Sequence, residues 1–239
     1  MTETTPPESP VFPTVAVLGA GTMGAGIAQV CAAAGCVVRL HDRGGEFIER
    51  GLAGITKFLD KGVERGKTTP EVRAETLARI SGAEQLGAAV ADAHLVIEAV
   101  PEDLGLKQTM FGQVVEHVDA ECVLATNTSS LSIADVFDGV PHAGRCLGMH
   151  FFNPVHIMKL VEVVRGNGSS DEAVAMTVEL AERMGTPAYL IDEAAPLTGP
   201  LVRNDQSTIN AHLACLDETE QSLYHVFISL YKTFEEEKT

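Results

Sequence analysis

The stretch Val15-Ala-Val-Leu-Gly-Ala-Gly-Thr-Met-Gly-Ala-Gly-Ile-Ala-Gln29 decides the fold of this chain. Its first four residues are apolar and predict a short buried strand over 15–18, while the alanine-rich segment 24–35 predicts a helix that ends at a glycine. Between them lies the pattern Gly-x-Gly-x-x-Gly, which connects a strand to a helix in dinucleotide-binding folds. The segment therefore predicts the opening of a β-α-β unit.

Outward from this unit, apolar β-branched runs alternate with segments of helical periodicity as far as residue 192. Strands are expected over 36–42, 94–100, 122–127, 145–152, 159–164 and 188–192, and helices over 46–66, 70–79, 104–118 and 171–185. This order predicts an α/β fold of the Rossmann type, a doubly wound and mostly parallel sheet with helices on both faces. We expect a loose tail over 1–12, one Rossmann domain over 13–193, and a linker with a short C-terminal helical appendage over 194–239.

Composition excludes several classes of protein. With 33 acidic and 17 basic residues, the 239-residue chain has a formal charge of −16, so it lacks the basic field that a general nucleic-acid binder needs. No apolar run approaches membrane-spanning length, and the N-terminus carries acid and proline where a signal peptide needs basic and apolar residues. The five cysteines are scattered, without zinc-ligand spacing, which indicates reduced thiols, no metal and a cytoplasmic protein.

Each glycine of the motif has a separate task. Gly19 allows a tight turn, Gly21 lets a pyrophosphate approach the backbone, and Gly24 lets the helix pack closely on the strand. Asp42 ends the next expected strand, where its carboxylate would accept hydrogen bonds from ribose hydroxyls and repel a 2′-phosphate. NAD is therefore expected rather than NADP, although the neighbouring Arg43 favours the alternative. The expected cofactor contacts here are Gly19, Gly21, Thr22, Met23, Gly24 and Asp42.

A second pattern joins His150-Phe-Phe-Asn-Pro154 to Lys159-Leu-Val-Glu-Val163. If the two strands fold back on each other around His156, His150 faces Glu162 with Cβ atoms about 5 Å apart. The carboxylate would then fix the tautomer of the imidazole and stabilise its protonated form, as in a general base with its orienting partner. A structural histidine satisfied by a nearby acid explains the pattern equally well. A Cys146–His150 nucleophile and base is excluded, because the two lie about 13 Å apart along one strand.

Three further clusters allow two interpretations each. Residues 126–130 (Thr-Asn-Thr-Ser-Ser) follow a strand, where ligands collect in doubly wound sheets, but Ser132-Ile-Ala-Asp135 resembles a helix cap, and the pattern alone favours the cap. Residues 98–107 also lead from a strand end into a helix, where charges are usually solvated. The basic residues within 61–67 could meet an anionic ligand, although a solvated helix face is the more common explanation.

Together, VAVLGAGTMGAGIAQ, VIEAVPEDLGLKQTMF, ATNTSSLSI and LGMHFFNPVHIMKLVEVVRG resemble the NAD-binding domain of the 3-hydroxyacyl-CoA dehydrogenase family, which includes 3-hydroxybutyryl-CoA dehydrogenases. The resemblance extends from about residue 15 to residue 192. It implies NAD-dependent oxidation of a 3-hydroxyacyl-CoA to the 3-oxoacyl-CoA, or the reverse, in which the cofactor supplies the redox chemistry and the protein supplies position and proton transfer.

The resemblance also implies a role for individual residues. His150 would be the general base that removes the proton of the 3-hydroxyl, and Glu162 would pair with it. Ser129 would contact the substrate oxygen and lie at the cofactor, with Asn127 and Asn153 near nicotinamide and ribose. The remaining implied contacts are Glu102 and Lys107 to the cofactor, and Lys61, Arg65 and Lys67 to the phosphates of coenzyme A.

The sequence departs from the family after residue 192. The family continues with Gly-Phe-x-x-Asn-Arg and an all-helical domain that forms the other wall of the cleft, whereas this chain reads Gly199-Pro-Leu-Val-Arg-Asn204 and ends at residue 239. We therefore expect a second copy or a partner subunit to complete the cleft around the acyl-CoA. The alternative is a truncated relative that binds NAD(H) with little or no catalysis, as a sensor or an assembly subunit.

Overall fold

The computed structural model describes residues 13–192 and residue 221. Residues 13–192 have an α/β fold, as the alternation of strands and helices predicts. The expected N-terminal tail over 1–12 and the expected linker and helix over 194–239 lie outside the described residues, apart from Gln221. Among the helices described, none is long and apolar enough to cross a membrane.

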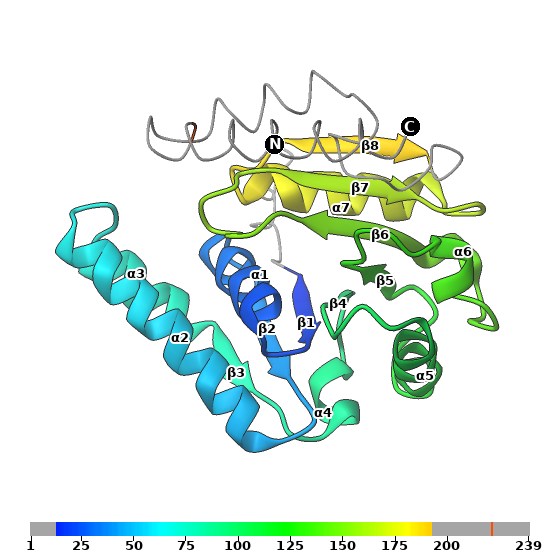
Figure 1. The fold of residues 1–239 in the computed structure, drawn as a ribbon, viewed down its shortest axis with the longest axis horizontal. Helices are drawn as coiled ribbons and strands as arrows, with labels where there is room; N and C mark the ends of the chain where they lie inside the picture. The colour runs from blue at the N-terminus through cyan, green and yellow to red at the C-terminus, as the bar shows by residue number, and fades with distance from the viewer. Residues whose placement is uncertain (1–12, 193–220, 222–239) are drawn as a thin grey trace, which may run out of the picture.

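The described residues form one eight-stranded sheet in the order β3-β2-β1-β4-β5-β6-β7-β8 (Figure 1). The strands are β1 Thr14–Leu18, β2 Val37–His41, β3 Ile80–Gly82, β4 Leu95–Glu98, β5 Val123–Thr126, β6 Cys146–Phe151, β7 Val161–Arg165 and β8 Ala188–Asp192. Neighbouring strands run parallel except β6 and β7, which pair antiparallel. The carboxyl ends of β1, β2, β4, β5 and β6 therefore meet at one edge of the sheet, where ligands bind in such folds.

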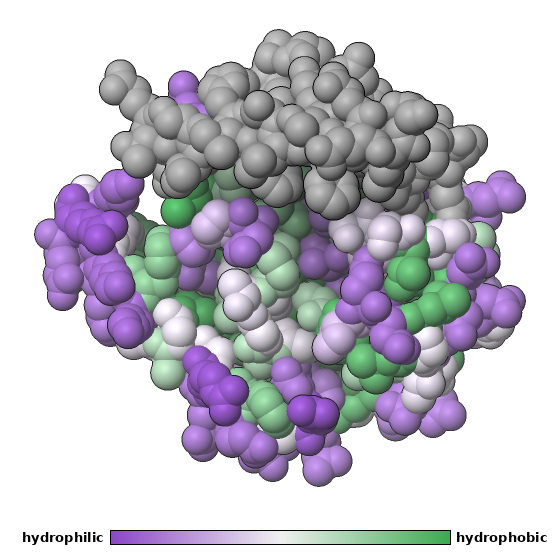
Figure 2. Space-filling model, viewed as in Figure 1, coloured by the Kyte–Doolittle hydropathy of each residue, from purple (hydrophilic) through white to green (hydrophobic). Residues whose placement is uncertain are grey.

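Helices cover both faces of this sheet (Figure 1). They are α1 Thr22–Ala33, α2 Gly45–Glu64, α3 Pro70–Ala78, α4 Leu86–Val90, α5 Leu104–Val114, α6 Ile133–Val136 and α7 Asp171–Arg183, with a 3₁₀ turn over Ala143–Arg145. One core joins the sheet to α1, α2, α3 and α7, and a second core joins the opposite face to α4, α5 and α6. Figure 2 shows hydrophilic side chains over the outer surface of α2 and α3.

Strand β1 shows why the central strands read as unbroken apolar runs. Val15 and Val17 belong to the first core, whereas Ala16 and Leu18 belong to the second, and all four are fully buried. A strand covered on both faces needs apolar residues at every position rather than at alternate ones.

The long elements agree with the sequence-based prediction to within a few residues, but three short ones were missed. Strand β3 has only three residues and is recruited by pairing of Ile80 with Val38 of β2. Helices α4 and α6 are too short to show a helical period. The expected cap is confirmed, because the Ser132 hydroxyl accepts the N–H of Asp135 at the start of α6.

Candidate active site

The glycine turn between β1 and α1 needs glycine at two positions for different reasons. Gly19 has a φ of +103°, and a Cβ on it would lie 2.7 Å from the carbonyl oxygen of Ala99. A Cβ on Gly24 would lie 1.7 Å from the carbonyl oxygen of Gly19. The turn therefore closes only because α1 packs its third glycine directly on the first.

Gly21 is required by neither close packing nor backbone strain. Its φ is −70°, and a Cβ built on it would meet no atom within 4 Å. It is also the N-cap residue of α1, where no side chain caps the first turn, so the backbone N–H groups there are available to an anion. These features fit a pyrophosphate that approaches the backbone at Gly21.

A cleft of about 540 Å³ opens beside this turn. Its lining includes the glycine turn and the end of β2, with Gly19, Gly21, Thr22, Met23, His41, Asp42 and Arg43, and an apolar wall made by Phe47, Ala99, Val100, Pro101, Leu106 and Met110. Small-molecule sites combine an apolar wall with a few fixed polar groups in this way. The residues present thus suit a nucleoside whose base lies against the wall and whose phosphates lie at the helix.

Asp42 is fixed by the backbone of the cleft. Its two carboxylate oxygens accept the N–H groups of Ala20 and Arg43, each at 2.7 Å. Since each carboxylate oxygen has a second lone pair, Asp42 can also accept hydrogen bonds from ribose hydroxyls. The guanidinium of Arg43 lies over the ring of Phe47, 4.8 Å from its centroid.

The predicted pairing of His150 with Glu162 is confirmed. The two residues are opposite partners in the β6–β7 ladder, and Nδ1 of His150 lies 3.0 Å from Oε2 of Glu162. A carboxylate can only accept a hydrogen bond, so Nδ1 carries the proton and Nε2 keeps its lone pair. The side chain of Glu162 is 3% exposed and that of His150 is 14% exposed, so the imidazole retains access to a ligand.

Burial raises the pKa of the Cys146 thiol to about 12, which agrees with its exclusion as a nucleophile.

Asn127 and the turn after β6 contact His150 or the residue that follows it. The N–H of Phe151 donates to Oδ1 of Asn127 at 2.8 Å, which joins the end of β5 to the end of β6 beside His150. The ring of Phe152 packs against the imidazole of His150, with centroids 4.5 Å apart. Asn153 follows at once and is exposed. Three of the predicted polar residues, His150, Asn127 and Asn153, thus come from one end of neighbouring strands.

Glu102 organises the loop that carries Ser129. Its Oε1 accepts the hydroxyl of Thr128 at 2.6 Å and the N–H groups of Ser129 at 3.0 Å and Ser130 at 3.3 Å. Burial opposes ionisation of Glu102, but the hydrogen bonds from Thr128 and Ser129 and the charge of Lys107 outweigh it, so the pKa of this carboxyl lies below its ordinary value.

Lys107 is not placed as expected. Its side chain is 1% exposed, and its Nζ lies 2.7 and 2.9 Å from the carboxylate oxygens of Glu98 and 3.3 Å from Glu102. The ammonium group therefore lies beneath the loop in contact with two carboxylates, and its contact with a cofactor stays a prediction. Glu98 was missed as a site residue, although a glutamate at the end of an apolar strand is a signal that a buried cation must accompany it.

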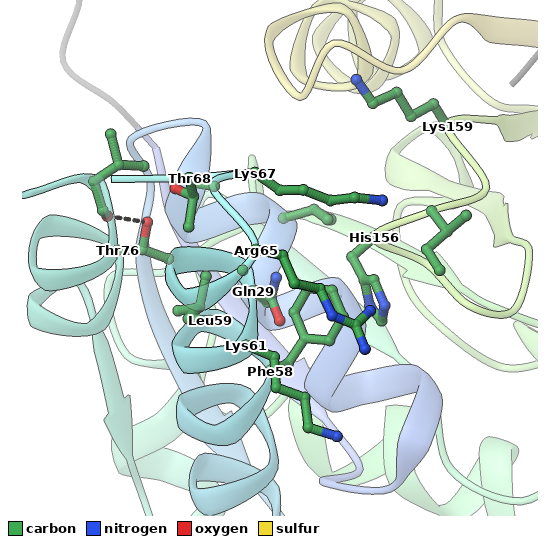
Figure 3. Close-up of a pocket in the computed structure, with 15 residues that line it drawn as sticks. Gln29, Phe58, Leu59, Lys61, Arg65, Lys67, Thr68, Thr76, His156 and Lys159 are labelled. Atoms are coloured by element: carbon green, nitrogen blue, oxygen red, sulfur yellow. Dashed lines mark hydrogen bonds between the residues drawn. The ribbon is translucent and has the colours of Figure 1, made fainter. Parts of the chain in front are cut away.

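The predicted basic cluster lines a groove of about 550 Å³ between α2, the α2–α3 connection and the segment after β6 (Figure 3). Lys61, Arg65 and Lys67 all lie on it, and the side chain of Arg65 lies beside His156 in Figure 3. Lys159 also lines the groove, from the segment after β6, and its ammonium group points away from the other three in Figure 3. The three residues thus share a concave surface, and all three are exposed, as a solvated helix face also requires.

The comparison with protein families agrees with this geometry. Residues 14–193 match the model of the "3-hydroxyacyl-CoA dehydrogenase, NAD binding domain". The chain belongs to this family. The matched range coincides with the described domain and contains the glycine turn, Asp42, the Ser129 loop and the His150–Glu162 pair.

Individual relatives cover the same part of the chain. It is 43% identical over 178 residues to the fatty acid oxidation complex subunit alpha of Psychrobacter arcticus, covering 74% of this chain and 25% of that one. It is 41% identical over 190 residues to the 3-hydroxyadipyl-CoA dehydrogenase of Escherichia coli, covering 76% of this chain and 40% of that one. A crystal structure of the (S)-3-hydroxybutyryl-CoA dehydrogenase of Ralstonia eutropha superposes with a TM-score of 0.74 at 36% identity, covering 76% and 64%. The chain thus spans between a quarter and two fifths of these two curated relatives.

Proposed function

We propose that this chain catalyses the NAD-dependent oxidation of a 3-hydroxyacyl-CoA to the 3-oxoacyl-CoA, or the reverse reaction. The observation that carries the proposal is the imidazole of His150, oriented by Glu162 at 3.0 Å and placed at the same sheet edge as the glycine turn. That edge brings a proton acceptor and a dinucleotide cleft together, which is the arrangement that alcohol oxidation requires.

His150 acts as the general base. Because Nδ1 donates to Glu162, the lone pair of Nε2 takes the proton of the substrate 3-hydroxyl, and Glu162 stabilises the imidazolium that forms. NAD, held by the glycine turn and Asp42, would supply the two-electron acceptor for the hydride of C3 that oxidation of the alcohol to a ketone requires. In the reverse direction, His150 returns its proton to the oxygen of the 3-oxo group.

The neighbouring polar residues bind and orient. The hydroxyl of Ser129 contacts the substrate oxygen, and the amides of Asn127 and Asn153 contact nicotinamide and ribose. Thr22, Met23 and the glycines would hold the pyrophosphate at the start of α1, and Asp42 would hold the adenosine ribose. Glu102 would contact the cofactor beside the loop that it binds. Lys61, Arg65 and Lys67 hold the phosphates of coenzyme A, which is supported by their common groove in a chain that is acidic overall.

The test compares turnover of the wild-type chain with that of His150→Ala. Wild type should form NADH from NAD and 3-hydroxybutyryl-CoA, and the variant should lose about 10²- to 10⁴-fold in kcat, the usual contribution of a general base. His117→Ala, at an exposed histidine after α5, is the matched control and should leave kcat unchanged. Wild-type turnover no faster than that of His150→Ala would refute the proposal for this chain.

NADH titration separates the proposed reaction from the alternative of a binding module. Both functions require NADH binding that is lost in Asp42→Ala, because that carboxylate faces the nucleotide cleft. Only the dehydrogenase also shows turnover. Binding without turnover across short and long acyl-CoAs would favour the module.

We also propose that a partner subunit or a second copy completes the cleft and that the protein is cytoplasmic. The name of the Psychrobacter relative, a complex subunit, supports the first proposal. The second is supported by the cysteines in the described part of the chain, Cys31, Cys36, Cys122 and Cys146, which are buried and unpaired. Light scattering of the purified protein with and without NADH and acyl-CoA measures the assembly directly.

A further inference from the structure

We propose that Glu98 and Lys107 are positioning residues for the loop that carries Ser129. The inference rests on the proposed function, because it assigns a task within the same site. The two side chains form an ion pair that is 0% and 1% exposed, at the sheet edge where β4 ends and α5 begins. Neither is among the residues that line the nucleotide cleft, so their effect on Ser129 is exerted through another residue.

Glu98 ties three elements together. Its Oε1 accepts the N–H of Val100 and the ammonium of Lys107, both at 2.7 Å, and its Oε2 accepts the hydroxyl of Thr126 at 2.6 Å and the same ammonium at 2.9 Å. The carboxylate thereby links the end of β4, the end of β5 and the first turns of α5. A wholly buried carboxylate is tolerated only with such a set of partners and a cation.

Lys107 carries this link to the loop. Its Nζ lies 3.3 Å from Oε2 of Glu102, while Oε1 of Glu102 accepts hydrogen bonds from Thr128, Ser129 and Ser130. One oxygen of Glu102 thus faces the buried pair, and the other holds the backbone of the loop. Glu98 thus contacts Lys107, Lys107 contacts Glu102, and Glu102 accepts the backbone N–H groups of the loop that carries Ser129.

The loop needs this anchor because packing does not hold its tip. Ser129 and Ser130 are both exposed, and their N–H groups donate to Glu102, whose own side chain is 37% exposed. A partly exposed carboxylate has several rotamers, and the Lys107 ammonium selects the one that faces the loop. A site residue is held in productive geometry by supporting groups of this kind.

Hydrogen exchange of the loop tests the proposal without reference to catalysis. In Glu98→Gln/Lys107→Met, which removes both charges together, exchange of the Ser129 N–H should rise about tenfold or more, since it loses a fixed acceptor, whereas the Ser130 N–H keeps the Thr128 hydroxyl as a second acceptor. The matched control is Thr177→Val, which removes a buried hydroxyl from α7, far along the chain from the loop. Unchanged loop exchange in the double variant, or an equal rise in Thr177→Val, would overturn the proposal.

A second variant decides the question if the double variant does not fold. Thr126→Val removes one hydrogen bond to Glu98 and leaves both charges in place. Loop exchange should rise about threefold while exchange in β1 stays constant, because only the anchor is loosened. Loop exchange equal to wild type in this variant would overturn the proposal as well.

Kinetics then show whether the loop position matters to the reaction. The folded variants should lose about tenfold in kcat with little change in KM for NAD, as expected when a reacting group is misplaced but the cofactor still binds. A loss confined to KM for NAD would overturn the positioning role and return Lys107 to a cofactor contact. An inactive wild type would refute the proposed function, whereas the exchange measurement would still decide how the loop is held.

Discussion

The position of Glu162 is set by strand pairing. It lies on β7 directly opposite His150, and its carboxylate is almost completely buried. The sequence alone predicted this contact, because the residue at which two antiparallel strands turn back determines which residues of the strands lie opposite each other. It did not predict the burial of Lys107, because the depth of a charged side chain depends on elements that meet only in three dimensions.

Replacing Glu162 by glutamine tests the tautomer argument. The amide of Glu162→Gln can donate to Nδ1 of His150, which moves the imidazole proton to Nε2 and removes the lone pair that accepts the substrate proton. We expect kcat to fall about 10²- to 10⁴-fold, by the same logic that applies to other oriented catalytic histidines, with NADH affinity unchanged. Glu172→Gln, at the exposed start of α7, serves as the control. An unaltered kcat would mean that Glu162 is only a structural partner of the histidine.

The strands and helices were predictable in proportion to their length. Strands such as β1 and helices such as α2 carry enough apolar periodicity to be read directly, and their observed bounds differ little from the expected ones. Strand β3 and helices α4 and α6 carry too few residues for any period, and they form because a neighbouring element supplies hydrogen bonds or a core contact. The glycine turn was predictable because backbone conformation and close packing require glycine at Gly19 and Gly24, whereas Gly21 has no steric requirement of its own.

Of two alanine substitutions in the glycine turn, one should mainly lower stability and the other should mainly weaken NADH binding. Gly24→Ala places a Cβ against the Gly19 carbonyl and should lower the free energy of unfolding by about 1–3 kcal/mol or more. Gly21→Ala meets no atom within 4 Å and should change stability by less than about 1 kcal/mol, yet weaken NADH binding tenfold or more. Chemical denaturation and NADH titration measure the two effects.

Gly112→Ala is the matched control for this pair. It lies on the exposed side of α5 with open space around it, so it should raise stability by about 0.5–1 kcal/mol through helix propensity and leave NADH binding as in wild type. If Gly21→Ala bound NADH as tightly as Gly112→Ala does, the backbone at Gly21 would not be the pyrophosphate site.

At the scale of the whole molecule, a basic groove lies on a protein with a formal charge of −16. Composition predicted the overall sign of the charge, and the spacing of Lys61, Arg65 and Lys67 predicted a local exception to it. The sequence did not reveal that the segment after β6 brings Lys159 to the groove, because that approach depends on tertiary packing. The positive electrostatic potential of these side chains favours an anionic ligand at the groove, and the negative charge of the rest of the protein disfavours it elsewhere.

Removing two charges from the groove should weaken acyl-CoA binding selectively. Lys61→Gln/Lys67→Gln is expected to raise KM for 3-hydroxybutyryl-CoA about tenfold at low ionic strength and to leave KM for the same acyl group on pantetheine, which lacks the nucleotide phosphates, unchanged. Lys57→Gln, an exposed position on α2 outside the groove, should affect neither substrate. Equal effects on both substrates would place the phosphates elsewhere.

The antiparallel pairing of β6 with β7 has a consequence for how this domain can vary. The ladder from Leu147 opposite Arg165 to Phe151 opposite Val161 determines which side chains meet. A single residue gained or lost inside either strand would therefore turn one member of the His150–Glu162 pair to the opposite face, so natural variants should keep the length of both strands.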